Sequence, residues 1–410
     1  MVRGLIVQKY GGSSVAGPAE IQNVAKRIIE TKNKGNDVVV VVSAPGDTTD
    51  NLIGLAKEIT PNPDERELDM LLATGEQQSI ALVAMAIKSL GFDAISFTGP
   101  QVGIVTDSVY TKARIKKIKN KNKIQKALKK GKIVIVAGFQ GVSLEDDITT
   151  LGRGGSDLTA VALAHALKAE ICELYKDVDG IFTANPRVVP EASLLSEIFY
   201  DEMLEMASLG AQVVNARSIE YAKKYDVPIR VRSSFNYSEG TLIREMEGKY
   251  MEKLVVSGVT YNKDEAKITI LWVPDKPGIA ARVFKAIADE NVNVDMIIQD
   301  VSEGGITNIS FTVSKSDLKK ALNAVDKIAK EVQATGVLSD EKISKVSIVG
   351  VGMLNHPGVA ARMFEALSEK GINIQMISTS EIKISCVIDE AHTEEAVRAI
   401  HKKFNLEKAK

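Results

Sequence analysis

A run of five consecutive valines, residues 38–42, constrains the fold more than any other feature of the sequence. A strand that is apolar on both faces must be covered on both sides, which is typical of strands inside a parallel sheet. Similar apolar runs alternate with helical patterns, and we therefore predict an α/β domain with a mostly parallel sheet over residues 1–245. The other strand patterns lie at residues 5–7, 133–137, 171–175 and 229–231, and the clearest helical patterns at 71–87 and 158–167.

The remainder of the chain contains two copies of one pattern, so that Pro277-Gly278 returns as Pro357-Gly358. Each copy reads strand, helix, strand, strand, helix, which indicates a small repeated module. The second copy lacks the closing strand pattern of the first, whereas an unassigned strand pattern at 254–261 precedes both copies. We expect two intertwined modules, one at 265–340 and one at 341–410 completed by the strand at 254–261, because this exchange leaves no unpaired sheet edge.

Composition excludes several classes of function. The 52 Lys and Arg residues nearly balance the 53 Asp and Glu residues, so no overall basic field for nucleic acid or a membrane exists. Residues 112–132 contain eleven basic residues and no acid, but no reading motif accompanies them, and we interpret them as a solvated face. Two distant cysteines, Cys172 and Cys386, indicate neither a disulfide framework nor a zinc site and suit a reducing cytoplasm. The absence of an apolar run of about 18 residues predicts that no segment spans a membrane.

The first strand pattern leads into Lys9-Tyr10-Gly11-Gly12-Ser13-Ser14 and then into a helical pattern. Adjacent glycines let the backbone approach a ligand, and amides at the start of a helix favour phosphate oxygens. Lys9 can add a positive charge to the same site. The lysine precedes the glycines, so the motif is not a P-loop. Taken alone, this motif favours a plain tight turn.

A second glycine cluster, Leu151-Gly152-Arg153-Gly154-Gly155-Ser156-Asp157, also precedes a helical pattern. An arginine between glycines is presented to its surroundings, and a guanidinium suits a carboxylate or phosphate partner. Asp157 fits the role of a helix N-cap equally well. Two such helix entrances in one α/β domain predict two facing anion sites, one for nucleotide phosphates and one for an anionic acceptor.

These two motifs and the segment from Tyr175 to Arg187 resemble the signatures of aspartate kinases (aspartokinases) of the amino acid kinase family. The two C-terminal copies resemble the paired ACT domains of that family, and residues 209–231 resemble its lysine- or lysine/threonine-regulated bacterial type. The resemblance covers essentially the whole chain. It implies an αβα sandwich kinase domain followed by two intertwined ferredoxin-like ACT domains.

The resemblance implies ATP-dependent phosphorylation of the side-chain carboxylate of L-aspartate to 4-phospho-L-aspartate, the first step of lysine, threonine and methionine biosynthesis. A carboxylate with a pKa near ~4 is already ionised at neutral pH, so no general base is needed. The catalytic residues implied are Lys9, which would neutralise the transferring phosphoryl group, together with Arg153 and Asp157. Mg²⁺ would be held mainly by ATP, and no metal site on the protein is expected.

The binding residues are likewise carried over from the family. Arg153, assisted by Ser156, would pair with a substrate carboxylate, and Glu76 would receive the substrate ammonium, although a glutamate near a helix start also fits a helix-dipole role. The aspartate-binding residues are Ser43, Thr49, Glu76, Arg153 and Ser156. The ATP-binding residues are Lys9, Tyr10, Gly11, Gly12, Tyr175, Lys176, Asp177, Asp179, Ile181, Phe182 and Arg187.

The ACT resemblance implies loops that bind lysine, threonine or both at a homodimer seam, with one copy serving only as a dimer strut as the alternative. Asp275 and Asp295 of the first copy become Asn355 and Gln375 in the second, so the first copy is the better candidate for a cationic effector. The effector residues implied are Asp275, Pro277, Gly278, Ile279, Ala280, Asn293, Asp295 and Gln299 in the first copy, and Val359, Ala360, Asn373, Ile374, Ser380 and Glu381 in the second.

Two other functions stay open at this point. The first is another enzyme of the amino acid kinase fold, such as a glutamate kinase, against which the paired repeats argue. The second is a non-catalytic amino-acid-sensing subunit. The presence of Lys9, Arg153, Ser156 and Asp157 argues against it.

Overall fold

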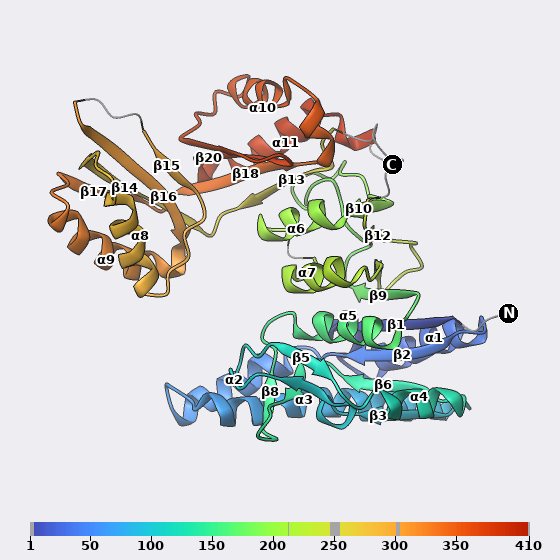
Figure 1. Ribbon diagram of the computed structural model, residues 1–410. Coiled ribbons are helices and arrows are strands. Elements are labelled where there is room, and N and C mark those ends of the chain that lie inside the picture. Colours follow the sequence, from blue (N-terminus) through green and yellow to red (C-terminus); the bar gives the residue numbers. More distant parts are fainter. Residues whose placement is uncertain (1–3, 212, 247–254, 301–303, 409–410) are drawn as a thin grey trace.

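The computed structural model describes residues 4–211, 213–246, 255–300 and 304–408. An N-terminal α/β domain, blue to green in Figure 1, is followed by two small modules, yellow to red. The second module lies against the N-terminal domain, and the first module extends from the second (Figure 1).

The N-terminal domain is built on an eight-stranded sheet with the order β10-β12-β11-β9-β1-β2-β6-β3. All neighbouring strands are parallel except β11 and β12, so the predicted mostly parallel sheet is confirmed. Val38 to Val42 are all completely buried, as a central strand requires. The strands are β1 Leu5–Tyr10, β2 Asp37–Val42, β3 Ala94–Phe97, β6 Ile133–Ala137, β9 Ile171–Lys176, β10 Glu197–Phe199, β11 Ile229–Ser233 and β12 Thr241–Arg244.

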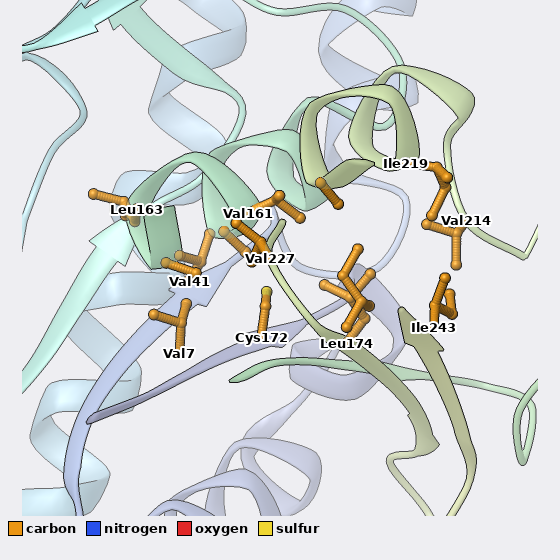
Figure 2. Close-up of a cluster of buried hydrophobic side chains, with 14 of the residues drawn as sticks. Val7, Val41, Val161, Leu163, Cys172, Leu174, Val214, Ile219, Val227 and Ile243 are labelled. Atoms are coloured by element: carbon orange, nitrogen blue, oxygen red, sulfur yellow. The ribbon is translucent and has the colours of Figure 1, made fainter. Parts of the chain in front are cut away.

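Helices cover both faces of this sheet. The core on one face is formed with α1 (Pro18–Asn33) and α3 (Glu65–Ser89). The core on the other face is formed with α4 to α7, and Figure 2 shows side chains of β1, β2, β9 and α5 packed together there. These four helices are α4 Lys121–Lys129, α5 Gly155–Leu167, α6 Tyr200–Ser208 and α7 Ala216–Tyr225.

Helix α3 is the one helix of the described chain that is long and apolar enough to cross a membrane. Half of its most apolar window is buried inside the protein, where the helix packs on the sheet. Core helices of this length meet the same criterion, and α3 carries buried carboxylates at Asp69 and Glu76. The helix is therefore explained by the packing of the domain.

The sequence analysis did not foresee a second sheet in this domain, with the order β5-β4-β7-β8. Its strands are three or four residues long, which is too short for a clear period-two signal. They are β4 Ile104–Thr106, β5 Ile115–Ile118, β7 Gln140–Val142 and β8 Ile148–Thr150, and the remaining helix of the domain is α2 Thr48–Ile59.

The glycine motif after β1 does not open the first α-helix directly, which corrects the prediction. It forms a short 3₁₀ turn, Gly12–Val15, and α1 begins at Pro18. The turn lies so close to the loop after β2 that a Cβ on Gly12 would be 2.8 Å from the carbonyl oxygen of Ala44. Gly12 is therefore required by the close approach of two backbones.

Both C-terminal modules have a four-stranded sheet covered by two helices. The first has the order β15-β16-β14-β17 and the second β13-β18-β20-β19. Strand β13 pairs antiparallel with β18, which is the position that the repeat comparison predicts for the strand at 254–261, of which residue 254 lies outside the described residues. The elements of the first module are β14 Glu265–Pro274, α8 Ile279–Asp289, β15 Ile297–Gln299, β16 Ile306–Ser314, α9 Leu318–Glu331 and β17 Gly336–Asp340. Those of the second are β13 Gly258–Asn262, β18 Ile343–Val349, α10 Val359–Ser368, β19 Met376–Thr379, β20 Lys383–Asp389 and α11 Thr393–Lys403.

A buried charge cluster joins the two modules. Lys345 of β18 is only 2% exposed and pairs with Glu265 of β14 and with Asp295 before β15. Burial alone would lower the pKa of Lys345, but the two carboxylates outweigh it and raise this pKa. A small apolar cluster that includes Met296 and Met376 packs at the same seam.

We predict that Lys345→Met destabilises the protein by about 3–5 kcal/mol, because Glu265 is then left as a buried charge without its partner. The double variant Lys345→Met/Glu265→Leu removes both buried charges and should recover most of this loss. Urea unfolding of the wild type and the two variants measures the effect. A single variant that unfolds like the wild type would show that the cluster does not hold the modules together.

Candidate active site

The site lies where parallel strands end side by side. Lys9 near the end of β1 is in register with Val41 of β2 and Leu174 of β9. Strand β2 follows β1 on one side, and the later strand β9 lies on the other side of β1. The order in which strands are added to the sheet therefore reverses at β1. A crevice at the carboxyl ends of strands next to such a switch point is where α/β sheets bind ligands.

Two lysines share one carboxylate at this edge. Lys9 Nζ lies 2.8 Å from Asp157 Oδ1, and Lys176 Nζ, at the end of β9, lies 2.6 Å from Asp157 Oδ2. Lys9 is 6% exposed and Asp157 is 2% exposed. Asp157 is the third residue of α5, whose N-cap is Gly154, so the N-cap reading of Asp157 is wrong.

The electrostatics of this cluster are unbalanced. Burial alone would raise the pKa of Asp157, but Lys176 and Lys9 outweigh it and lower this pKa to about 2. Burial lowers the pKa of Lys9, and the positive charge of Lys176 adds to that effect against the attraction of Asp157. Two ammonium groups around one carboxylate leave one positive charge in excess, and this favours an anionic ligand.

Glu76 is the second buried acidic group of the site. It lies on α3, is 2% exposed, and its Oε1 accepts a hydrogen bond from the Ala44 amide at 3.1 Å. Its Oε2 has no hydrogen-bond partner among the described residues. Burial raises the pKa of Glu76 to about 8, against the weaker attraction of Lys9. Because an unpartnered buried carboxylate oxygen costs free energy, this oxygen is suited to accept a hydrogen bond from a cationic or neutral donor.

The loop after β2 lies directly over this part of α3. A Cβ on Gly75 would be 2.7 Å from the Cβ of Ala44, so the loop packs tightly beside Glu76. Ser43 precedes Ala44 and is half-buried, and Thr49 lies in the first turn of α2. The structure therefore brings Ser43, Thr49 and Glu76 to one region, as the resemblance implies.

Arg153 and Ser156 lie at the entrance of α5, on the same helix turn that supplies Asp157. Arg153 is exposed, whereas Ser156 is buried against Gly138, where a Cβ would come within 2.7 Å of the serine side chain. Asn215 donates from Nδ2 to the Arg153 carbonyl at 3.1 Å.

Sequence reasoning missed the residues that support the Arg153 loop. One is Asn215, whose side chain also packs directly against Gly154. The other is Arg217 of α7, which donates to the Leu151 carbonyl at 2.7 Å and to the Ala113 carbonyl at 3.0 Å. The asparagine cap before α7 gave a local signal for a helix start. Nothing in the local pattern pointed to a partner some 60 residues away.

Comparisons with known proteins give matches over most of the chain. A model of the amino acid kinase family matches residues 4–233, and an ACT domain model matches 273–328 and 346–404. The aspartokinase of Corynebacterium efficiens is 52% identical over 406 residues, which cover 98% of this chain and 96% of the relative.

The chain belongs to the aspartokinase family.

Solved structures extend the comparison. The aspartate kinase from Synechocystis is 45% identical, and the match covers 98% of this chain and 69% of that one, with a TM-score of 0.55. Escherichia coli aspartokinase III in complex with aspartate and ADP has a TM-score of 0.80 at 24% identity, with 97% and 99% of the chains covered, and shows the fold. The same enzyme has been solved with lysine and aspartate, at a TM-score of 0.75, 23% identity and coverage of 98% and 99%.

The residues predicted to bind ATP at Tyr10 and in the segment from Tyr175 to Arg187 are only partly accessible. Tyr10 and Tyr175 stack on one another with ring centroids 4.5 Å apart, and both rings are buried, so a ligand cannot contact them without rearrangement. Ile181 is buried and Phe182 is half-buried, whereas Asp177 and Arg187 are exposed. Asp179 accepts a hydrogen bond from Asn236 at 2.6 Å. ATP binding by these residues stays a prediction, and only backbone groups and the exposed side chains are accessible for it.

The first ACT module contains a cavity of about 410 Å³ at its Pro-Gly loop. Six of the predicted effector residues line it, namely Asp275, Pro277, Gly278, Ile279, Ala280 and Gln299. Asn293 and Asp295 do not line this cavity, and Asp295 pairs with Lys345 of the second module instead. The pair links the two modules, and the contact of Asp295 with an effector ammonium stays a prediction.

The second ACT module differs at the corresponding loop. Val359 is buried in the module core, and Ala360 and Ile374 are partly buried against it. Asn373 and Glu381 are exposed, and the Ser380 amide closes a turn on the Lys383 carbonyl at 2.9 Å. Effector binding by these residues stays a prediction.

We predict that Glu76→Gln raises the thermal unfolding temperature at pH 8 and leaves it unchanged near pH 4.5. The folded-state pKa of Glu76 is about 8 against an ordinary value of 4.5, so the carboxyl destabilises the fold as pH rises between these values. The variant should gain roughly 2–4 kcal/mol at pH 8. A melting curve with the same pH dependence as the wild type would refute the raised pKa.

Proposed function

We propose that this enzyme transfers the γ-phosphoryl group of ATP to the side-chain carboxylate of L-aspartate and forms 4-phospho-L-aspartate. The observation that carries the proposal is the pair of lysines on one buried aspartate beside a buried glutamate with an open oxygen. The first group suits phosphates, and the second suits the ammonium of an amino acid. The names of the relatives support the same reaction, and E. coli aspartokinase III has been solved with aspartate and ADP.

The reaction needs little proton chemistry from the protein. The acceptor carboxylate has a pKa near ~4 and is ionised at neutral pH, so it attacks without a general base. The barrier comes from bringing an anionic acceptor to an anionic phosphoryl group, and phosphoryl transfer is catalysed mainly by positioning and charge stabilisation. Lys9 neutralises charge on the transferring phosphoryl group, while Asp157 holds the Lys9 ammonium in place through their ion pair.

The substrate aspartate is held by three kinds of contact. Glu76 accepts hydrogen bonds from its ammonium, and the ammonium in turn keeps Glu76 ionised despite its burial. Arg153 pairs with a carboxylate of the substrate, and Ser156 and the loop that carries Ser43 and Thr49 supply neutral donors.

ATP is held by the strand ends of β1 and β9. The amides of Gly11 and Gly12 and the ammonium groups of Lys9 and Lys176 bind its phosphates. The rest of the nucleotide contacts Asp177, Asp179, Ile181, Phe182 and Arg187. This donor set consists of amides and cations, which suits phosphate oxygens. The described residues contain no cluster of three metal-ligating side chains, so Mg²⁺ would be bound mainly by the phosphates and would supply charge neutralisation there.

Lysine, threonine or both inhibit the enzyme by binding the cavity of the first ACT module. Amides at the start of α8 suit an effector carboxylate, and Asp275 suits an ammonium. The chain forms at least a homodimer through its ACT modules, supported by the exposure of Ile297 (53%) and Ile377 (42%) on the edge strands β15 and β19. We place the enzyme in the cytoplasm, which suits its two buried free thiols.

The direct test measures ADP release from Mg-ATP with aspartate, glutamate or N-acetylglutamate as acceptor. Aspartate should be the preferred acceptor, and lysine and threonine, added alone and together, should then reveal the type of inhibition. Turnover with glutamate alone would instead support a glutamate kinase. No turnover with any acceptor would support an amino-acid-sensing subunit.

We predict that Lys9→Met lowers kcat by about 10²–10³-fold, because it removes the positive charge nearest the transferring phosphoryl group. Asp157 keeps its ion pair with Lys176, so the domain should still fold, which circular dichroism checks. Lys32→Met, which breaks the partly buried pair with Asp37 away from the site, is the matched control and should turn over like the wild type. Near wild-type turnover of Lys9→Met would remove Lys9 from the mechanism.

We predict that Asp275→Asn raises the half-inhibitory concentration of the effector by about 5-fold or more and leaves kcat unchanged. Asp295→Asn is the informative comparison, because Asp295 faces Lys345 and not the cavity. Its inhibition curve should shift less than that of Asp275→Asn. Identical curves for Asp275→Asn and the wild type would place the effector site elsewhere.

A further inference from the structure

The two ACT modules contact the catalytic domain unequally. In the described residues, the catalytic domain forms hydrogen bonds and ion pairs only with the second module and not with the first. The second module is counted here with its strand β13 and with Ser257 just before that strand. The first module, which holds the effector cavity, is joined to the second through Lys345 and the Lys315–Glu390 pair. Within one chain, a signal from the cavity therefore reaches the catalytic domain through the second module.

The point of contact is the continuation of the ATP-binding segment. Ala184, Val188 and Val189 are buried in the hydrophobic core of the second module, although they follow Ile181, which is buried in the core of the catalytic domain. Figure 1 shows this part of the catalytic domain lying below the sheet of the second module. One short stretch of chain thus belongs to both cores.

Thr183 lies at the crossing between the two cores and is completely buried. Its carbonyl accepts from the Val259 amide of β13 at 2.7 Å, and its amide donates to the Ser193 carbonyl at 2.9 Å. Its hydroxyl oxygen accepts from the Ser193 amide at 3.0 Å and lies 2.9 Å from Nε2 of His401 on α11. Thr183 therefore follows any movement of β13 and α11 relative to the catalytic domain.

His401 is 2% exposed, and its ring nitrogen faces a side chain of the other domain. Burial lowers the pKa of His401, so the ring is neutral at pH 7. A buried polar contact of this kind is sensitive to small displacements, because an unmade hydrogen bond at a buried site costs more than a made one contributes.

A second contact keeps the two domains in register. Glu202 of α6 is buried, and its Oε1 accepts from the Ser257 hydroxyl at 2.6 Å and from the Val351 amide at 3.0 Å. Val351 begins the loop of the second module that corresponds to the cavity loop of the first. In the second module this loop is therefore anchored on the catalytic domain, which suits a mechanical connection.

We propose that His401 is a positioning residue that transmits the state of the ACT modules to the ATP-binding segment through Thr183. The inference rests on the proposed regulation by lysine and threonine. It adds that effector binding acts on the apparent affinity for ATP through this contact. The contact residue itself touches neither substrate nor effector.

The test compares His401→Leu, which removes the hydrogen bond, with His401→Gln, which retains a polar group near the position of Nε2. For each, the KM for Mg-ATP and kcat are measured with and without saturating L-lysine plus L-threonine, and calorimetry measures the binding of both amino acids. In His401→Leu the amino acids should still bind, but the rise in KM for ATP that they cause should shrink by about two- to tenfold. His401→Gln should restore much of that rise, and kcat at saturating ATP should stay unchanged in both.

Ile400→Val is the matched control, because it loosens the core of the second module on the same helix without touching the contact. It should keep the wild-type response. If His401→Leu does not fold, His401→Asn against His401→Gln makes the same comparison, because the asparagine side chain is one methylene shorter and does not reach Thr183.

The outcomes separate the two proposals. A wild-type enzyme that neither amino acid inhibits overturns the regulation and this inference together. A wild type that is inhibited, with an unchanged response in His401→Leu, overturns only the role of His401. A response lost equally in His401→Leu and Ile400→Val would assign the effect to general loosening of the module and also overturn it.

Discussion

The site depends on one electrostatic constraint, which is that a single buried carboxylate serves two ammonium groups. Asp157 can neutralise Lys9 or Lys176 but not both. The site therefore carries excess positive charge next to groups that are almost fully buried. Such an arrangement costs folding free energy and is held only by a rigid scaffold. The scaffold is the packed core below it, where Cys172 and Leu174 of β9 meet Val161 of α5 (Figure 2). In the proposed function, a bound phosphate would neutralise this excess positive charge. The folding free energy that the charge costs would then contribute to phosphate binding.

The same logic applies to Glu76, with the opposite sign. Burial favours its neutral form, and in the proposed function an ammonium brought by the substrate would restore its charge. In the proposed function, the site would therefore select its ligands by charge. The end with Lys9 and Lys176 is cationic and suits phosphates, whereas the end with Glu76 suits a cation. A carboxylate acceptor attached to an ammonium fits between them, which is the charge pattern of an acidic amino acid.

The sequence predicted the sheet well because its central strands are apolar on both faces, and Val38 to Val42 have no other explanation. It predicted that Lys9, Arg153 and Ser156 belong to glycine turns, because these residues are local to their motifs. It left an N-cap role open for Asp157 beside the catalytic one, and it did not foresee the pair of Asp295 with Lys345, because the partners of both aspartates lie far away in the chain. Likewise, the short second sheet and the burial of Tyr10 and Tyr175 are set by tertiary packing, which periodicity does not report.

The repeat also shows how duplicated modules take different roles. The charge at Asp275 and the open cavity remain in the first copy, while the second copy has its loop tied to Glu202 and its core shared with residues 184–189. The exchange of β13 is central to this division, because the strand that completes the second module also carries the Val259 amide bonded to Thr183. If β13 completed the first module instead, the module with the cavity would itself be bonded to Thr183. In the regulation proposed above, intertwining would let one copy bind the effector while the other transmits its state.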